Sequence, residues 1–250
     1  MFHPSSPKIL LTNDDGIASP KLEKLACALS TCGQVFVVAP SSERSGVSHA
    51  FTGAPGLEVL PVDGYDCPAF SVSGTPSDCV KFAVSEGLCQ GAPDLVVSGV
   101  NMGENSGVSA LYSGTVAGAR EAALWGLPGL ALSVSDDSEA MLDRAIDFAC
   151  KVVSEGLFAA MPKAVFWNVN FPVGSVEYKG LRLTRMCTAM FTDHYDLRGG
   201  RYYLDGEKHL QKAALGTDDR ELAEGYATLT PHKVDQTCEA ELERLAHIDF

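Results

Sequence analysis

The feature that most restricts the fold of this chain is a repeated order of segments, in which an apolar run, a polar glycine-rich turn and a helical stretch follow one another. Residues 35–39 and 95–97 are apolar without interruption, which is typical of strands buried on both faces of a parallel sheet. Ahead of the first of these runs, Leu22, Leu25 and Leu29 fall on one helical face. Strands that alternate with helices in this way predict an α/β fold with a Rossmann-like, mostly parallel sheet and helices on both faces.

The same patterns give the boundaries of the expected elements. Strands are expected at residues 9–11, 35–39, 69–72, 95–97, 129–134 and 164–171, and helices at residues 20–29, 76–88, 113–125 and 138–155. Thr75 is expected to cap the second helix, and Gly126 is expected to end the third in the C′ position. A chain of 250 residues is long enough for one elaborated α/β domain with a large core.

The periodic pattern fades after about Leu181, which indicates a different kind of structure near the C-terminus. Residues 185–210 are rich in aromatic side chains, as in a long hairpin, and residues 238–245 have the amphipathic pattern of a short helix. We expect residues 1–180 to form the catalytic core. Residues 181–250 are expected to form a hairpin arm and an oligomerisation segment, either separately or within a single domain, because a protruding aromatic arm is more often an interface than a catalytic element.

Composition argues against several classes of function. The formal net charge of −13 disfavours nucleic-acid and anionic-membrane binding, because those partners require a basic surface. The eight cysteines include no Cys-x-x-Cys pair, which argues against a zinc or redox motif and favours reduced thiols. The sequence contains neither a secretory signal nor an apolar run of about 18 residues, so we expect a cytoplasmic protein without a membrane span.

Two adjacent carboxylates, Asp14 and Asp15, follow directly on the first expected strand, within the sequence Thr-Asn-Asp-Asp-Gly at residues 12–16. In an open α/β sheet, active sites form beyond the carboxyl ends of the strands. Neighbouring carboxylates repel each other, so a proton, a basic side chain or a metal ion must neutralise the pair. The ordinary alternative is a solvated turn, because Asn, Asp and Gly dominate turns for local reasons.

Oxygen-bearing side chains follow two further expected strands. Ser45 lies in the polar loop after the second strand, and Asn101 lies just after the run at residues 95–97. Since the carboxyl ends of parallel strands share one edge of a sheet, we expect Ser45 and Asn101 to lie near the two aspartates. Carboxylate, hydroxyl and amide oxygens suit a hard divalent ion, so we expect one Mg²⁺, Mn²⁺ or Ca²⁺ per subunit.

A helix is expected to open at Ser113, Gly114 and Thr115. The first turn of a helix offers free backbone N–H groups, and here two hydroxyls accompany them, which together form a ready cradle for phosphate. A metal site beside a phosphate cradle indicates phosphate chemistry.

Five stretches of the sequence occur in the order that they have in one known family. They are residues 12–16, 44–48, 74–80, 98–105 and 112–116, and a weaker match runs from residue 216 to residue 231. On these stretches the chain resembles the SurE-type metal-dependent 5′-nucleotidases, which are nucleoside monophosphate phosphatases. The resemblance covers nearly the whole chain.

The resemblance implies a Rossmann-like core with a hairpin and a C-terminal tail exchanged between subunits, giving a homodimer or a homotetramer. The metal ligands that it implies are Asp14, Asp15, Ser45 and Asn101. The phosphate-binding residues that it implies are Asn105, Ser113, Gly114 and Thr115.

The resulting hypothesis is an enzyme that hydrolyses nucleoside 5′-monophosphates to nucleoside and phosphate through a metal-activated water. Asp14 or Asp15 is expected to accept the proton of that water, and 3′-monophosphates or polyphosphate are further candidate substrates. One alternative is an aspartyl-phosphate phosphatase, although such enzymes have two aspartates separated by one residue. The other is a non-catalytic Mg²⁺-binding phospho-acceptor or nucleotide-binding module, although no Gly-x-Gly-x-x-Gly fingerprint follows the first strand.

Three charged residues beside these motifs have both structural and functional interpretations. Arg44 either guides phosphate into an acidic protein or is a solvated loop residue. Asp78 is expected to act in helix capping, and Glu121 is expected to lie on a helix surface or to support the site indirectly. The histidines form no metal-spaced pair and are expected to have structural or surface roles: His49, His194, His209, His232 and His247.

Overall fold

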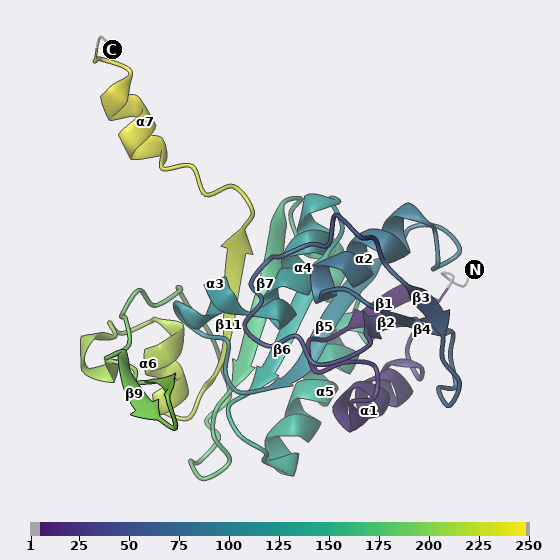
Figure 1. The fold of residues 1–250 in the computed structure, drawn as a ribbon, viewed down its shortest axis with the longest axis horizontal. Helices are drawn as coiled ribbons and strands as arrows, with labels where there is room; N and C mark the ends of the chain where they lie inside the picture. Colours follow the sequence, from purple (N-terminus) through teal and green to yellow (C-terminus); the bar gives the residue numbers. More distant parts are fainter. Residues whose placement is uncertain (1–5, 249–250) are drawn as a thin grey trace.

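A nine-stranded sheet forms the centre of the protein, in the strand order β3-β4-β2-β1-β5-β6-β7-β11-β8 (Figure 1). The computed structural model describes residues 6–248. Residues 1–5 of the expected core and residues 249–250 of the expected C-terminal segment lie outside it. The strands of this sheet are β1 (Lys8–Thr12), β2 (Gln34–Pro40), β3 (Val59–Pro61), β4 (Ala69–Val72), β5 (Leu95–Met102), β6 (Gly129–Val134), β7 (Val165–Phe171), β8 (Leu181–Leu183) and β11 (Ala227–Lys233).

Parallel pairing runs without interruption from β4 to β7, which confirms the predicted α/β class. At one edge the short β3 pairs antiparallel with β4. At the other edge β11 pairs antiparallel with β7, and β8 pairs parallel with β11. The Rossmann-like core is therefore a mixed sheet whose antiparallel pairs lie toward its two edges.

Helices cover both faces of the sheet. They are α1 (Pro20–Leu29), α2 (Pro76–Ser85), α3 (Ser109–Tyr112), α4 (Gly114–Leu124) and α5 (Glu139–Ser154), with a 3₁₀ turn at Leu157–Ala160. Figure 1 shows α1 and α5 on one side of the sheet and α2 and α4 on the other. Side chains alternate along β1, so that Ile9 and Leu11 pack in the cluster with α1 and α5, whereas Leu10 packs in the cluster with α2.

The predicted helix caps are found where the sequence placed them. The Thr75 side chain accepts a hydrogen bond from the Asp78 backbone N–H, and the Asp78 side chain accepts one from the Thr75 backbone N–H. This reciprocal pair is a capping box, and it satisfies two N–H groups that the first turn of α2 would leave free. The Ser113 side chain caps α4 by accepting a hydrogen bond from the Val116 N–H. Gly126 follows the end of α4 with φ +73°, as expected for a C′ glycine.

The C-terminal part contains a separate two-stranded hairpin, β9 (His194–Arg198) and β10 (Arg201–Asp205), which confirms the predicted arm. A 3₁₀ turn at Leu210–Lys212 and the helix α6 (Asp218–Ala223) follow the arm, and the chain then returns to the sheet through β11. The expected division at residue 180 stays a prediction, and the sheet takes β8 and β11 from its C-terminal side.

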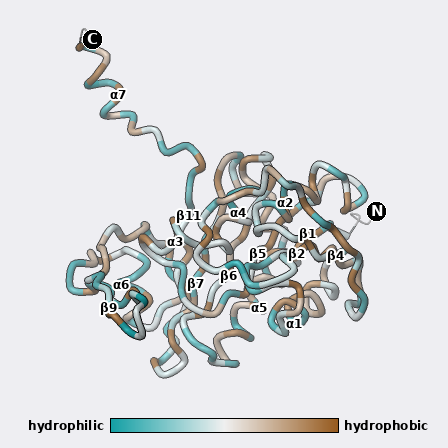
Figure 2. Tube along the Cα trace, viewed as in Figure 1, coloured by the Kyte–Doolittle hydropathy of each residue, from teal (hydrophilic) through white to brown (hydrophobic). Residues whose placement is uncertain are grey.

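The last helix, α7 (Glu239–Leu245), projects away from the sheet (Figure 1). Its trace alternates between hydrophilic and hydrophobic residues (Figure 2), and Leu242 is 58% exposed. Among the helices described for residues 6–248, none combines the length and the apolar character needed to cross a membrane.

Candidate active site

An open pocket of about 590 Å³ lies beyond the carboxyl ends of β1 and β5. The predicted site residues in its lining are Asp14, Ser45, Asn101, Asn105 and Ser113. The other predicted residues adjoin this lining, because Asp15 follows Asp14 in the chain and both Gly114 and Thr115 contact Asp14. The structure therefore brings the whole predicted set to one edge of the sheet.

The Asp14 carboxylate is held against the start of α4. Its Oδ1 accepts a hydrogen bond from the Thr115 hydroxyl at 2.5 Å, and its Oδ2 accepts one from the Thr115 backbone N–H at 3.1 Å. A Cβ atom at Gly114 would lie 3.0 Å from the Asp14 Cβ, so this close approach favours glycine. Burial raises the pKa of Asp14 and the charge of Asp15 adds to that shift, whereas the hydrogen bonds from Thr115 oppose it.

Asp15 carries a buried carboxylate oxygen without a hydrogen bond. Within the described residues its Oδ2 has no hydrogen-bond partner, and the Lys21 ammonium lies 3.6 Å away, within ion-pair distance only. A buried polar atom without a partner is costly, and a buried charge more so. A cation bound at the Asp14 and Asp15 pair would remove that cost, so these two residues fit a metal ion.

Ser45 and Asn101 complete the set of oxygen donors. The Asn101 amide nitrogen donates to the Gly103 carbonyl at 2.8 Å, which leaves the Asn101 Oδ1 available to a ligand. The Ser45 hydroxyl donates to Glu43 Oε1 at 2.7 Å, so the lone pairs of the Ser45 oxygen can still bind a cation. Two carboxylates, a hydroxyl and an amide oxygen form a donor set that suits Mg²⁺, Mn²⁺ or Ca²⁺ better than a metal that prefers thiolate.

Side chains of the neighbouring strands β6 and β7 hold Asn105 in place. Its backbone N–H donates to Asn170 Oδ1 at 2.7 Å, and its carbonyl accepts from the Asn168 amide at 2.8 Å. Its side-chain nitrogen donates to Ser133 Oγ at 2.9 Å. We did not expect these three supporting residues from the sequence, although two asparagines at alternate positions of an otherwise apolar strand are a signal that could have identified them.

The arm, defined as residues 190–208 around the β9–β10 hairpin, forms one side of the pocket. We did not predict this role from the sequence. Met190, Phe191 and Leu204 line the pocket together with Tyr112. The exposed fractions of Met190, Leu204 and Tyr112 are 51, 61 and 59%, so the pocket has an apolar wall facing solvent. No periodic pattern in the sequence marks which side chains of a hairpin arm face inward.

Glu121 is only 3% exposed, so it does not lie on a helix surface, and its carboxylate accepts three hydrogen bonds. Its carboxylate accepts from His49 Nε2 and Lys81 Nζ at 2.8 Å each and from Trp125 Nε1 at 2.9 Å. Burial by itself would raise the pKa of Glu121, but these hydrogen bonds together lower it from 4.5 to about 2. These hydrogen bonds join the loop that contains both Ser45 and His49 to α2 and α4.

Asp78 has the capping role that the sequence indicated, together with a second contact. Its side chain also accepts hydrogen bonds from the backbone N–H and the hydroxyl of Thr52, both at 2.8 Å, and so fixes the segment after His49 to α2. Arg44 lies outside the pocket lining, and its backbone N–H donates to the Asp14 carbonyl at 2.7 Å. Both residues therefore hold loops beside the site.

The hairpin brings His194, Asp196 and Asp205 together, with one potential ligand atom from each within 4.8 Å of the others. The arrangement arises because His194 and Asp205 are directly opposite in the β9–β10 pairing. Arg198 already neutralises both carboxylates, at 2.7 Å from Asp196 and 3.8 Å from Asp205. We therefore assign no metal ion to this exposed group.

Comparisons with known proteins agree with this geometry. The family model described as Survival protein SurE matches residues 9–193 of the chain. The 5′-nucleotidase SurE of Flavobacterium psychrophilum is 38% identical over 255 residues, which cover 98% of this chain and 99% of the relative. The 5′-nucleotidase SurE of Syntrophotalea carbinolica is 41% identical over 241 residues, which cover 92% of each chain.

A solved structure gives the same result. The SurE protein from Aquifex aeolicus matches with a TM-score of 0.82 and 32% sequence identity, over 96% of this chain and 99% of that one. The family model spans most of the chain, and the relatives align over nearly all of it. The resemblance inferred from the five motifs is thus confirmed, and the chain belongs to the SurE family.

Proposed function

We propose that this protein is a metal-dependent 5′-nucleotidase that hydrolyses nucleoside 5′-monophosphates to nucleoside and phosphate. Its relatives carry the name 5′-nucleotidase SurE, and its own site supports the same chemistry. The observation that carries the proposal is the gathering of Asp14, Ser45 and Asn101 in the lining of one pocket, beside Asp15, whose buried Oδ2 has no hydrogen bond within the described residues.

Asp14, Asp15, Ser45 and Asn101 would hold the metal ion. A divalent ion there would draw charge from the phosphoryl oxygens and lower the pKa of a bound water. Thr115 keeps Asp14 in place for this role through its N–H and hydroxyl. The two acidic residues also supply the group that accepts the proton of the attacking water, at a carboxylate oxygen of Asp14 or Asp15.

The phosphate would lie between the start of α4 and Asn105. The backbone N–H of Gly114 and the hydroxyl of Ser113 are at the N-terminus of a helix, where donors and the helix dipole favour an anion. The Asn105 main chain and amide are held by three hydrogen bonds, so that little reorganisation is needed when charge develops on the phosphoryl group. A phosphate contact for Thr115 stays a prediction, since both of its donors already bind Asp14.

Direct attack by water fits the spacing of the carboxylates better than a covalent phosphoenzyme does. Asp14 and Asp15 are adjacent, and Gly16 and Ile17 follow them. The covalent alternative needs an acid–base carboxylate two residues after the nucleophile, and that position is occupied by an uncharged residue. We include 3′-monophosphates and polyphosphate as further candidate substrates.

We also propose that the protein is a homodimer or homotetramer held by the arm and by an exchanged C-terminal segment. The projecting α7 and the exposed Tyr195, Leu197 and Tyr202 of the arm support this proposal. Light scattering after size exclusion is expected to give at least twice the chain mass. A monodisperse monomer at micromolar concentration would contradict it without affecting the catalytic proposal.

The catalytic proposal is tested by phosphate release from AMP, with added Mn²⁺ and with EDTA. Activity is expected only with the divalent ion. Asp14→Asn and Asp15→Asn are each expected to lower kcat by at least about a hundredfold while the far-UV circular dichroism is retained. Asp63→Asn, an exposed aspartate after β3, is the matched control and should keep full activity. Wild-type turnover by Asp14→Asn at saturating metal would refute the assignment of the metal site.

A further inference from the structure

The arm is closed at its base by contacts between its two ends. Phe191 and Lys208 face each other in an antiparallel bridge. Next to them the Thr192 N–H donates to the Glu207 carbonyl at 2.9 Å, and the Glu207 N–H donates to the Thr192 hydroxyl at 3.0 Å. The contacts that hold the base of the arm therefore also set the position of the side chains that the arm presents to the pocket.

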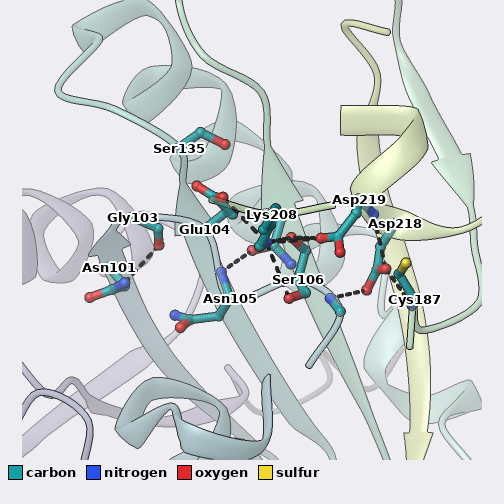
Figure 3. A network of polar contacts seen from close by, with 12 residues as sticks. Asn101, Gly103, Glu104, Asn105, Ser106, Ser135, Cys187, Lys208, Asp218 and Asp219 are labelled. Carbon is teal, nitrogen blue, oxygen red and sulfur yellow. Dashed lines mark hydrogen bonds and ion pairs between the residues drawn. The ribbon is translucent and has the colours of Figure 1, made fainter. Parts of the chain in front are cut away.

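The Lys208 ammonium joins the base of the arm to two other parts of the protein (Figure 3). It donates to Asp219 Oδ1 of α6 at 2.9 Å and to Ser106 Oγ at 3.0 Å, and it pairs with Glu104 Oε1 at 3.3 Å. The Ser106 hydroxyl in turn donates to the same oxygen of Asp219 at 2.6 Å. The Lys208 side chain is 12% exposed and that of Asp219 is 2% exposed, so these contacts are largely shielded from solvent.

The two segments that carry Ser106 and Asp219, both partners of Lys208, are also joined to each other through the neighbouring residues Gly107 and Asp218. Asp218 accepts hydrogen bonds from the Gly107 N–H at 2.8 Å and the Cys187 N–H at 2.7 Å. Gly107 has φ +54°, and a Cβ atom there would lie 2.4 Å from Asp219 Oδ2, so only glycine fits between this loop and α6. Ser106 and Gly107, which follow Asn105, are thus fixed to α6 independently of the arm.

The arm side chains that depend on this anchor line the pocket opposite the metal and phosphate residues. Phe191 lines the pocket and also a neighbouring one of about 510 Å³, and the Lys208 ammonium lies 5.6 Å from the centroid of its ring. Met190 and Leu204 line the same pocket and are more than half exposed. An apolar wall with one aromatic ring suits a flat base, because stacking on an aromatic side chain stabilises any nucleobase.

We propose that Lys208 is a positioning residue for substrate selection, which holds the arm against residues 104–107 so that Phe191 and Leu204 form the nucleoside side of the pocket. The inference rests on the proposed nucleotidase function. In this arrangement the phosphate residues lie on the sheet and α4, whereas the nucleoside side depends on the arm. Release of the arm should therefore weaken recognition of the nucleoside more than it weakens cleavage of a phosphate ester.

The test compares kcat/KM for AMP with kcat/KM for methyl phosphate, which lacks a nucleoside, in Lys208→Met, Lys208→Arg and wild type at saturating Mn²⁺. For Lys208→Met we expect the ratio of the two values to fall roughly tenfold, mainly through KM for AMP, as for the loss of one stacking contact. Lys208→Arg keeps the charge and should recover most of the ratio. Lys212→Met, which changes an exposed lysine four residues further along, should keep the wild-type ratio.

Phe191→Ala provides a second route, because it removes the ring without changing any ion pair and should give the same fall in the ratio. Equal losses for AMP and methyl phosphate in Lys208→Met, or an unchanged ratio in both variants, would overturn the proposal. Binding of adenosine, measured by titration calorimetry, separates this proposal from the proposed function. Suppose that wild type cleaves neither ester but binds adenosine, and that Lys208→Met weakens this binding roughly tenfold: only the catalytic proposal then fails. Equal adenosine binding by wild type and Lys208→Met would refute the role of Lys208.

Discussion

Replacement of Glu121 by glutamine should destabilise the protein in a pH-dependent way. Glu121 is 3% exposed and accepts hydrogen bonds from His49, Lys81 and Trp125. Its pKa falls from 4.5 to about 2 in the folded protein, and at about 1.4 kcal/mol for each pH unit this corresponds to about 3 kcal/mol at neutral pH. Because glutamine still accepts one hydrogen bond and the half-exposed Lys81 can turn to water, we expect Glu121→Gln to cost about 2–3 kcal/mol at pH 7.

The sign of the pH dependence follows from the direction of the shift. The folded-state pKa lies below the unfolded-state value, so the carboxylate stabilises the folded protein fully above about pH 4.5 and loses this effect as the pH falls toward 2. Roughly 2 kcal/mol of the difference between wild type and Glu121→Gln should therefore disappear between pH 6 and pH 3. Groups that do not contact Glu121 titrate in both proteins and cancel in the difference.

Urea denaturation followed by circular dichroism at several pH values measures this difference directly. The matched control is Glu86→Gln, which changes an exposed glutamate at the end of α2 and should cost less than about 0.5 kcal/mol at every pH. If the difference in the free energy of unfolding between wild type and Glu121→Gln stays constant from pH 6 to pH 3, the ionised Glu121 carboxylate is not its source.

Three further predictions concern the site and its supports. Thr115→Val removes the hydroxyl that binds Asp14 and should lower kcat about tenfold with little change in KM for AMP, whereas Thr115→Ser should retain activity. Thr75→Ala removes the cap of α2 and should lower the free energy of unfolding by about 1 kcal/mol in urea titrations, and an unchanged midpoint would contradict the cap's role. Hydroxylamine trapping during turnover of AMP should yield no hydroxamate, and a hydroxamate at Asp14 or Asp15 detected by mass spectrometry would establish the covalent mechanism instead.

The helices and the parallel strands could be predicted because each leaves a local pattern in the sequence. Buried strands such as β2 are continuously apolar, and the leucines of α1 recur at helical spacing. The strands β8 and β11 are different, since β8 has only three residues, all exposed, and the alternation in β11 spans only residues 227–230 before Pro231, so both patterns are too short to identify a strand. Their place in the sheet depends on tertiary pairing, of β11 with β7 and of β8 with β11, which a local pattern does not record.

The same distinction applies to the site. Asp14 and Ser45 follow strand ends and Asn101 lies in the last two residues of β5, and the parallel topology brings strand ends to one edge. The supports of the site are contacts between distant residues, such as Thr115 with Asp14 and Asn168 with Asn105. Such pairs are specified by three-dimensional packing, so one sequence identifies the reacting groups more readily than the residues that hold them.

In the proposed function, the residues that support chemistry are separate from those that would contact the nucleoside. The oxygen donors belong to strand ends, to the loop after β2 and to the start of α4, and among them Asp14, Ser113 and Thr115 are buried. Apart from Tyr112 of α3, the apolar wall belongs to the arm, whose base is joined to residues 104–106 and α6 through the Lys208 ammonium. If the arm contacts the nucleoside as we propose, a change in the arm should alter which nucleotide is accepted while the proposed phosphate groups keep their positions, so that substrate preference changes without a change in the reaction.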